Sequence, residues 1–172
     1  MRSAFAFIVL TAAGLSAALG GARPATAATV TASVNASASK PLVLSELQDL
    51  DLGTVTLGPG LWSNATISLS QNGALSCTST NIICSGSTQV AQYNVQGSNQ
   101  QAVRISVPNV TLTNQSDSTK TLTLMTDKPA TVTLTNSGAP GTDFSIGGSV
   151  TLNSTTTVGT YVGTFNVTAD YQ

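Results

Sequence analysis

Cysteines and carboxylates are the side chains in this sequence that could do chemistry, since the chain contains no histidine. Without histidine it lacks the commonest general base, and with it the Ser-His-Asp and Cys-His arrangements of hydrolases. The seven acidic residues are scattered, and a pair such as Glu46 with Asp49 or Asp51 would need a cleft that no sequence feature indicates. The sequence therefore predicts a protein that is not an enzyme.

Glu46, Asp49 and Asp51 are also the residues closest to a metal-binding pattern. Their spacing is not that of an EF-hand calcium loop, and a solvated turn is the simpler explanation. The glycine-rich stretches at 138–141 and 147–148 lack the strand-to-helix context and the lysine of a phosphate loop, so we interpret them as turns. We expect no metal and no cofactor.

The N-terminus has the features of a secretory signal peptide. Arg2 is followed by an apolar run over residues 4–19 and by the small-residue cleavage site Ala25-Thr26-Ala27. The run is short for a bilayer span, and no later segment is long enough. We expect residues 1–27 to be removed, leaving a mature chain that starts at Ala28 and is not inserted in a membrane.

Export would place Cys77 and Cys84, the only two cysteines, in an oxidising compartment. They bracket residues 78–83, a spacing that a hairpin can close. A thiol redox site would have two residues between its cysteines, and a zinc site would need more ligands. We therefore predict a structural disulfide between Cys77 and Cys84.

The surface of this chain should be polar but nearly uncharged. Charged residues make up 8% of the sequence and the formal net charge is −1. No basic patch is present for nucleic acid or anionic lipid, so neither is an expected partner. A neutral exported surface suits packing against copies of the same protein, although it would also suit a monomeric secreted domain.

Short alternating apolar runs, separated by turn residues every eight to twelve positions, predict an all-β sandwich. Residues 46–51 could hold a helical turn but little more, and Asn72-Gly73 marks a tight turn. Trp62 suits a core or strand-edge anchor better than a sugar-stacking surface. The runs are 30–38, 42–57, 65–69, 91–95, 103–107, 110–112, 122–124, 132–134, 144–146, 150–152 and 159–171.

The last run is the most regular, and the sequence ends inside this expected strand. Its apolar or aromatic residues fall on every second position and should share one face. Phe165 and Val167 should lie in the core, flanked by Tyr161 and Tyr171. The residues of this face are Tyr161, Gly163, Phe165, Val167, Ala169 and Tyr171.

A terminal strand with a penultimate tyrosine and with Gly159 fourteen residues from the end resembles the tail of bacterial pilus subunits assembled by the chaperone–usher route. In those subunits, a periplasmic chaperone and then a neighbouring subunit pair with the tail. The resemblance implies the same partners for Gly159 and the alternating residues from Tyr161 to Tyr171. An ordinary C-terminal strand of a β-sandwich would have the same periodicity.

A second resemblance covers nearly the whole mature chain and rests on the order of several short motifs. They are Pro41-Leu-Val-Leu44, Leu50-Asp-Leu-Gly53, Tyr93-Asn-Val-Gln-Gly97, Val103-Arg-Ile-Ser-Val-Pro108, Ile146-Gly-Gly-Ser-Val-Thr-Leu152 and the final strand. Together they resemble a secreted bacterial family known as domain of unknown function 4402, which usually has Phe where this chain has Leu52. That family is similar to spore coat protein U and archaic pilin domains.

These resemblances imply an immunoglobulin-like, pilin-like sandwich with an N-terminal extension strand. We expect residues 1–27 to be the signal peptide, 28–40 the extension and 41–172 the sandwich domain. The implied location is the cell surface or exterior of a Gram-negative bacterium, reached through the periplasm. The implied partners are identical or homologous subunits, a periplasmic chaperone and an outer-membrane usher.

Residues 28–39 have the pattern of a donated strand, with Val30, Ala32, Val34 and Ala36 on one face and no proline before position 41. Added beside the last strand of a neighbouring subunit, this segment would complete its sheet. Alternatively, it is the protein's own first strand. We expect a structural subunit of a fimbria or surface coat assembled by strand donation; the alternative function is a monomeric secreted sandwich that binds a glycan or surface ligand.

Overall fold

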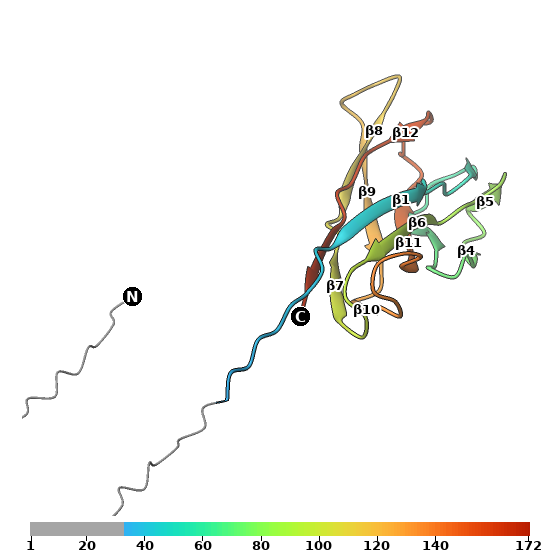
Figure 1. Ribbon diagram of the computed structural model, residues 1–172. Helices are drawn as coiled ribbons and strands as arrows, with labels where there is room; N and C mark the ends of the chain where they lie inside the picture. Colours follow the sequence, from blue (N-terminus) through green and yellow to red (C-terminus); the bar gives the residue numbers. More distant parts are fainter. Residues whose placement is uncertain (1–32) are drawn as a thin grey trace, which may run out of the picture. The chain divides into compact units, whose positions relative to one another are not determined.

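The computed structural model describes residues 33–172, so the predicted signal peptide lies outside the described residues. Within this range the fold is all-β, as predicted, with antiparallel strands and no helix. This range therefore has no helix with the length and apolar character needed to cross a membrane. All the strands belong to one compact unit, Ser37–Gln172 (Figure 1).

The strands are short apart from one. In chain order they are β1 (Val43–Gln48), β2 (Thr54–Leu57), β3 (Ala65–Leu69), β4 (Leu75–Cys77), β5 (Ile82–Ser85), β6 (Ala91–Gln96), β7 (Ala102–Ser106), β8 (Val110–Asn114), β9 (Thr121–Asp127), β10 (Thr131–Thr133), β11 (Thr142–Leu152), β12 (Tyr161–Val162) and β13 (Thr168–Tyr171). The helical turn considered for residues 46–51 is absent, because β1 continues to Gln48.

Three sheets form a sandwich-like arrangement. The largest has the order β1-β6-β11-β9-β8-β12, with β3 beside β11 and β4 beside β3. A second sheet has the order β10-β7-β13, and β2 pairs with β5 in a third. Because β12 and β13 stand last in their sheets, the outer edge of the C-terminal segment is unpaired within the described residues.

Strand β11 is one long strand where the sequence predicted two strands and a turn. Its first part pairs with β6 and its second with β3; Gly147 lies between the two parts, and Gly148, opposite Leu69, begins the second. A Cβ at Gly147 would collide with the carbonyl oxygen of Leu69, and a Cβ at Gly148 would lie 3.0 Å from that of Met125. The turn prediction was wrong: these glycines allow close approach of neighbouring strands.

The predicted last strand is divided in two. β12 pairs with β8 and β13 pairs with β7, while residues 163–167 between them are in no strand. Their partners β7 and β8 are separated in the same way, at Pro108, which has no N–H to donate. The pairing is therefore interrupted both between β7 and β8 and between β12 and β13. The predicted alternation is nevertheless present, since the odd-numbered side chains from Phe165 to Tyr171 are half-buried and the even-numbered ones exposed.

Two clusters of buried side chains make up the interior. The first, called here the closed core, contains Ala91, Tyr93, Val95, Val103, Ile105, Val107, Val132, Leu134, Phe144 and Ile146. The second, the open core, contains Ile67, Val110, Leu124, Val150 and Leu152. Half-buried Leu50 and Phe165 pack against both clusters. The two cores differ in how completely strands cover them.

Candidate functional site

A groove of about 540 Å³ lies over the open core. Residues 50–57 form one wall and residues 156–165 the other. Its floor is the inner face of the large sheet, with side chains from Ile67, Leu112, Leu122, Leu124, Val150 and Leu152. An apolar floor between two walls that do not pair with each other is what a missing strand would leave.

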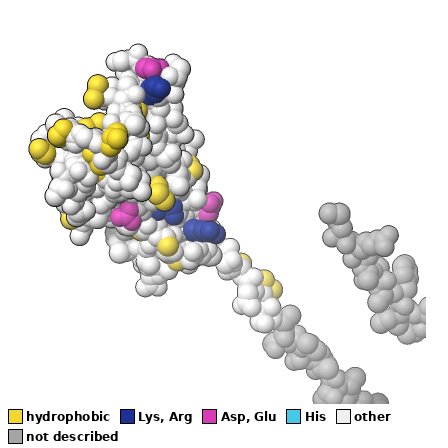
Figure 2. All heavy atoms as spheres, turned by 180° about the vertical axis from the view of Figure 1, so that it is seen from behind, with side chains coloured by type: hydrophobic (Ala, Val, Ile, Leu, Met, Phe, Trp, Pro, Cys, Tyr) yellow, Lys and Arg dark blue, Asp and Glu magenta, His cyan; other side chains and the backbone are white. Residues whose placement is uncertain are grey.

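Large apolar side chains are also exposed on segments next to the groove. Val158 from the second wall is 79% exposed, and Ile83, from the strand that pairs with β2, is 67% exposed. Leu61, in the loop after β2, is 95% exposed. Figure 2 shows hydrophobic side chains gathered on one part of the surface, with charged side chains at scattered places. Contiguous exposed apolar surface is typical of interaction sites.

A buried asparagine holds the second wall. Asn114 is 1% exposed, and its Nδ2 donates to the carbonyl oxygen of Val158 over 3.1 Å. Its Oδ1 accepts hydrogen bonds from the backbone N–H groups of Ser116 and Asp117. Gly159 has a φ of 144° and a Cβ there would lie 2.5 Å from Nδ2 of Asn114, so this predicted site residue is a glycine for steric reasons.

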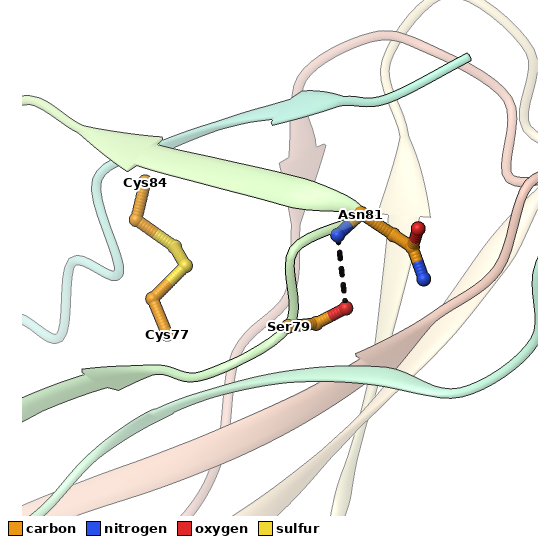
Figure 3. The surroundings of a disulfide bond; sticks show 4 residues. All are labelled: Cys77, Ser79, Asn81 and Cys84. Atoms are coloured by element: carbon orange, nitrogen blue, oxygen red, sulfur yellow. Dashed lines mark hydrogen bonds between the residues drawn. A yellow bond between two sulfur atoms is a disulfide. The ribbon is translucent and has the colours of Figure 1, made fainter.

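The disulfide predicted between Cys77 and Cys84 is confirmed, with its Cα atoms 6.3 Å apart (Figure 3). The two cysteines do not close a hairpin, however. β4 pairs with β3, whereas β5 pairs with β2, where Cys84 lies opposite Val55. The hairpin prediction failed because spacing alone does not specify strand partners. The disulfide therefore links the β2–β5 pair, part of the first wall, to the large sheet.

The far end of the C-terminal segment is joined to the start of the sandwich. Tyr171 Oη donates to the carbonyl oxygen of Lys40 over 2.7 Å and accepts a hydrogen bond from the N–H of Ser98, also over 2.7 Å. A Cβ on buried Gly97 would collide with the Tyr171 hydroxyl, so this position also requires glycine. Figure 1 shows the C-terminus beside the chain that enters β1.

The residues predicted to form the acceptor strand lie along one side of both cores. Tyr161, Gly163 and Phe165 line the groove. Phe165 packs against both cores, and Val167, Ala169 and Tyr171 pack against the closed core. Phe165 and Val167 are half-buried instead of fully buried, since no strand covers their outer side.

The predicted donor residues are only partly within the described range. Val30 and Ala32 lie outside it. Val34 is 89% exposed, Ala36 is exposed, and residues 33–40 are in no strand. The described part of this segment is therefore not a strand of the protein's own sheets.

The acidic residues considered for chemistry lie on the surface near β1. Glu46 and Asp49 share a hydrogen bond, which raises the pKa of Glu46. Asp51 accepts from the N–H of Gly53 over 2.8 Å and so supports a turn. Among residues 33–172, no three His, Cys, Asp or Glu side chains are grouped as metal ligands would be.

Several residues of the groove were not singled out from the sequence. Leu112 and Leu122 belonged to predicted strands, but nothing in their spacing distinguishes a half-covered leucine from a buried one. Asn114 had no signal, because a polar residue at a strand end usually faces solvent. Trp62, by contrast, is a half-buried anchor: it packs against the open core and donates to the carbonyl oxygen of Gly58 over 3.1 Å.

Comparison with known proteins gives one relationship. Neither the curated proteins nor the solved structures compared with the chain include a match. A family model described as Domain of unknown function (DUF4402) matches residues 42–171, which include both cores, both walls of the groove and the C-terminal segment. The chain therefore belongs to the DUF4402 family, the family that its sequence motifs resemble.

Proposed function

We propose that this protein is a structural subunit of an extracellular fimbria or surface coat in a Gram-negative envelope, assembled by strand donation. The observation that carries the proposal is the groove, whose apolar floor lies beside the unpaired edge of the C-terminal segment. An unpaired edge next to exposed apolar side chains leads to aggregation unless another strand covers it. On this proposal the sandwich is pilin-like and lacks one strand.

The N-terminal extension has the properties that such a strand needs. Residues 28–38 match residues 161–171 in length, alternate small apolar with polar side chains, and carry no charge. Val34 is free to contact a partner, as its exposure indicates. Strand addition would supply main-chain hydrogen bonds along the edge, while Val30, Ala32, Val34 and Ala36 would face the floor of the groove.

The same groove would serve different partners in turn. Before assembly, a periplasmic chaperone would cover it with one of its own strands, and an outer-membrane usher would exchange that strand for the extension of the next subunit. The predicted signal peptide supplies the route to the periplasm. No catalytic step belongs to this proposal, and the exposed carboxylates near β1 act in solvation and in the support of turns.

Size-exclusion chromatography and negative-stain microscopy of the mature protein test this proposal. We expect polymers from the chain that starts at Ala28 and none after deletion of residues 28–39. Val34→Asp should also prevent polymers, because it would bury an unpaired charge in the groove. The matched control, Ser33→Asp, puts the same charge on the other face and should still polymerise. A wild-type monomer that melts cooperatively at high temperature without a chaperone or added peptide would contradict the proposal.

The alternative function, binding of a glycan by a monomer, has one observation in its favour. A second hollow, of about 310 Å³, is lined mostly by hydroxyl and amide side chains, including Thr121, Asn153 and Thr155, and by Lys120 and Tyr161. Such side chains suit a hydroxylated ligand. Glycan-array binding by a monomeric wild type, lost in Asn153→Ala, would favour this function.

A further inference from the structure

The chain is held firmly at the point where the extension joins the sandwich. The backbone N–H of Lys40 donates to Ser98 Oγ over 2.7 Å, and its carbonyl oxygen accepts from Tyr171 Oη over 2.7 Å. Its Nζ donates to the carbonyl oxygen of Ser137 over 3.1 Å. Ser98 also donates its own N–H to Tyr171. Both backbone polar groups of Lys40 are thus engaged.

We propose that this arrangement, the Tyr171 clasp, prevents the extension from filling the groove of its own subunit and so directs it to a second copy of the chain. The clasp consists of Tyr171, Ser98 and Lys40. The inference rests on the proposed function and adds to it a means of favouring donation between subunits over self-completion.

The path required for self-completion explains why the clasp opposes it. Lys40 lies at the Tyr171 end of the C-terminal segment, as their hydrogen bond requires. An extension pairing with the outer edge of residues 161–171 in its own subunit would therefore have to end at Lys40 and reverse at once into β1. The reversal would fall on residues 39–42.

The residues at this point are poorly suited to such a turn. Pro41 would be the third residue of the turn, where proline forces the preceding residue out of the helical conformation that a type I turn needs. Lys40 would be the second residue of this turn, and its N–H and carbonyl groups already hold its backbone in place through the bonds to Ser98 and Tyr171. Self-completion would have to break these bonds, whereas donation to another subunit leaves them intact.

The fit around Tyr171 indicates that the clasp is built into the sandwich. The hydroxyl rests against Gly97, where a Cβ would also lie 2.8 Å from Leu134 and 2.9 Å from Leu42. The tyrosine ring packs against the closed core. The position of the Tyr171 hydroxyl is thus fixed by Gly97 and the closed core.

Tyr171→Phe in the mature chain tests the clasp, because it removes the hydroxyl and keeps the ring. Tyr93→Phe is the matched control: it removes the hydroxyl of a closed-core tyrosine that belongs neither to the clasp nor to the lining of the groove. Ser98→Ala is a second clasp variant that leaves both aromatic rings in place. The measurements are the polymer fraction in size-exclusion chromatography and the melting temperature of the monomer fraction.

We expect Tyr171→Phe and Ser98→Ala to lower the polymer fraction severalfold and to produce a monomer whose melting temperature falls when residues 28–39 are deleted. Tyr93→Phe should polymerise like the wild type. If both clasp variants polymerise like the wild type, the clasp inference is wrong and the proposed function stands. If the wild type itself does not polymerise, the proposed function fails first. If Tyr171→Phe does not fold, the polymer fraction and monomer melting temperature of Ser98→Ala test the clasp instead.

Discussion

The closed core and the open core are built from the same kinds of residue, but only the open core has a groove over it. In the closed core, Ala91, Val95, Val103 and Ile146 are 0% exposed, because the β1-β6-β11 part of the large sheet faces the β10-β7-β13 sheet. Over the open core lies a groove of about 540 Å³, and its floor includes the half-buried Leu112 and Leu122. The groove and the half-buried leucines of its floor thus belong to one half of the sandwich.

Because of this difference, we expect the two halves to contribute differently to stability and to strand binding. The closed core brings ten buried residues together, which contributes to the stability of the domain, and Tyr171 and Leu44 of β1 pack against it. The open core leaves apolar side chains half-covered, which lowers stability in isolation but leaves binding energy available for an added strand. Substitutions in the two halves should therefore respond differently to a bound strand.

The largest expected effect is in the closed core. Ile105→Ala removes a side chain that is 1% exposed and should cost about 2–5 kcal/mol of unfolding free energy, with or without a bound strand. Leu122→Ala, on the half-covered floor of the groove, should cost less in the isolated domain and more once a strand is bound. Urea unfolding with and without donor peptide measures both. Equal costs for the two variants in the isolated domain would remove the distinction between the cores.

Phe165 lies where the two cores meet, so its loss should affect both. We expect Phe165→Ala to cost about 3 kcal/mol, the lower end of the range for buried phenylalanines, because the ring is only half-buried. That is enough to reduce soluble accumulation strongly in a small domain. Asn166→Ala on the exposed face is the control and should accumulate normally. Equal tolerance of both changes would mean that the register of the C-terminal segment is wrong.

Loss of the disulfide should affect the groove more than the closed core. The double substitution Cys77→Ser and Cys84→Ser should cost about 2.5 kcal/mol by the chain-entropy estimate for a loop of this length. Because the disulfide ties β5, and through it β2, to the large sheet, hydrogen exchange should increase first in residues 54–57. Exchange that rises equally in β6 and β7 would mean that the disulfide supports the whole sandwich.

The smallest expected effects are on the pH dependence of stability, and they have opposite signs at Glu46 and Asp117. The hydrogen bond with Asp49 raises the pKa of Glu46 above its ordinary value of 4.5, so the folded state holds this proton more tightly. That contribution is present below the ordinary pKa and is lost as pH rises through the raised one. Hydrogen bonds from Thr119 lower the pKa of Asp117 below 3.8, so its contribution is present above 3.8 and is lost as pH falls through the lowered pKa.

Glu46→Gln should therefore gain stability relative to wild type as pH rises, and Asp117→Asn should lose it. Both carboxylates lie at the surface, with Glu46 exposed and Asp117 half-buried, so the changes in urea midpoint should be small. Urea midpoints measured across the acid range for both variants and the wild type provide the comparison. Midpoint curves parallel to wild type for both variants would contradict these assignments.

Much of this architecture was predictable from alternation alone. The period of two located most strands and the buried face of the C-terminal segment, because each strand has one face toward the interior. Export and the presence of a single cysteine pair predicted the disulfide. What alternation could not supply was the partner of each strand, as the separate pairing of β4 and β5 illustrates.

The sequence predicted that a partner strand would bind beside the C-terminal segment, but it did not identify the residues that form the groove. Gly147 and Gly148 suggested a turn because close approach and chain reversal select the same residue. Asn114 stabilises the wall through a hydrogen bond to Val158, 44 positions away, which no local pattern reveals. The Tyr171 hydroxyl likewise donates to Lys40, which lies 131 positions earlier in the sequence. Long-range contacts of this kind depend on the fold itself.

The most direct test of the central claim is strand complementation in solution. Thermal unfolding of the chain lacking residues 28–39 would be followed with a synthetic peptide of residues 28–39 and with the same peptide carrying Val34→Asp. At a peptide concentration about 100 times its Kd, binding adds about 2.7 kcal/mol, which should raise the Tm by about 10 °C in a domain of this size. The Val34→Asp peptide should give no shift. A Tm unchanged by the wild-type peptide at saturating concentrations, or raised equally by both, would contradict the account.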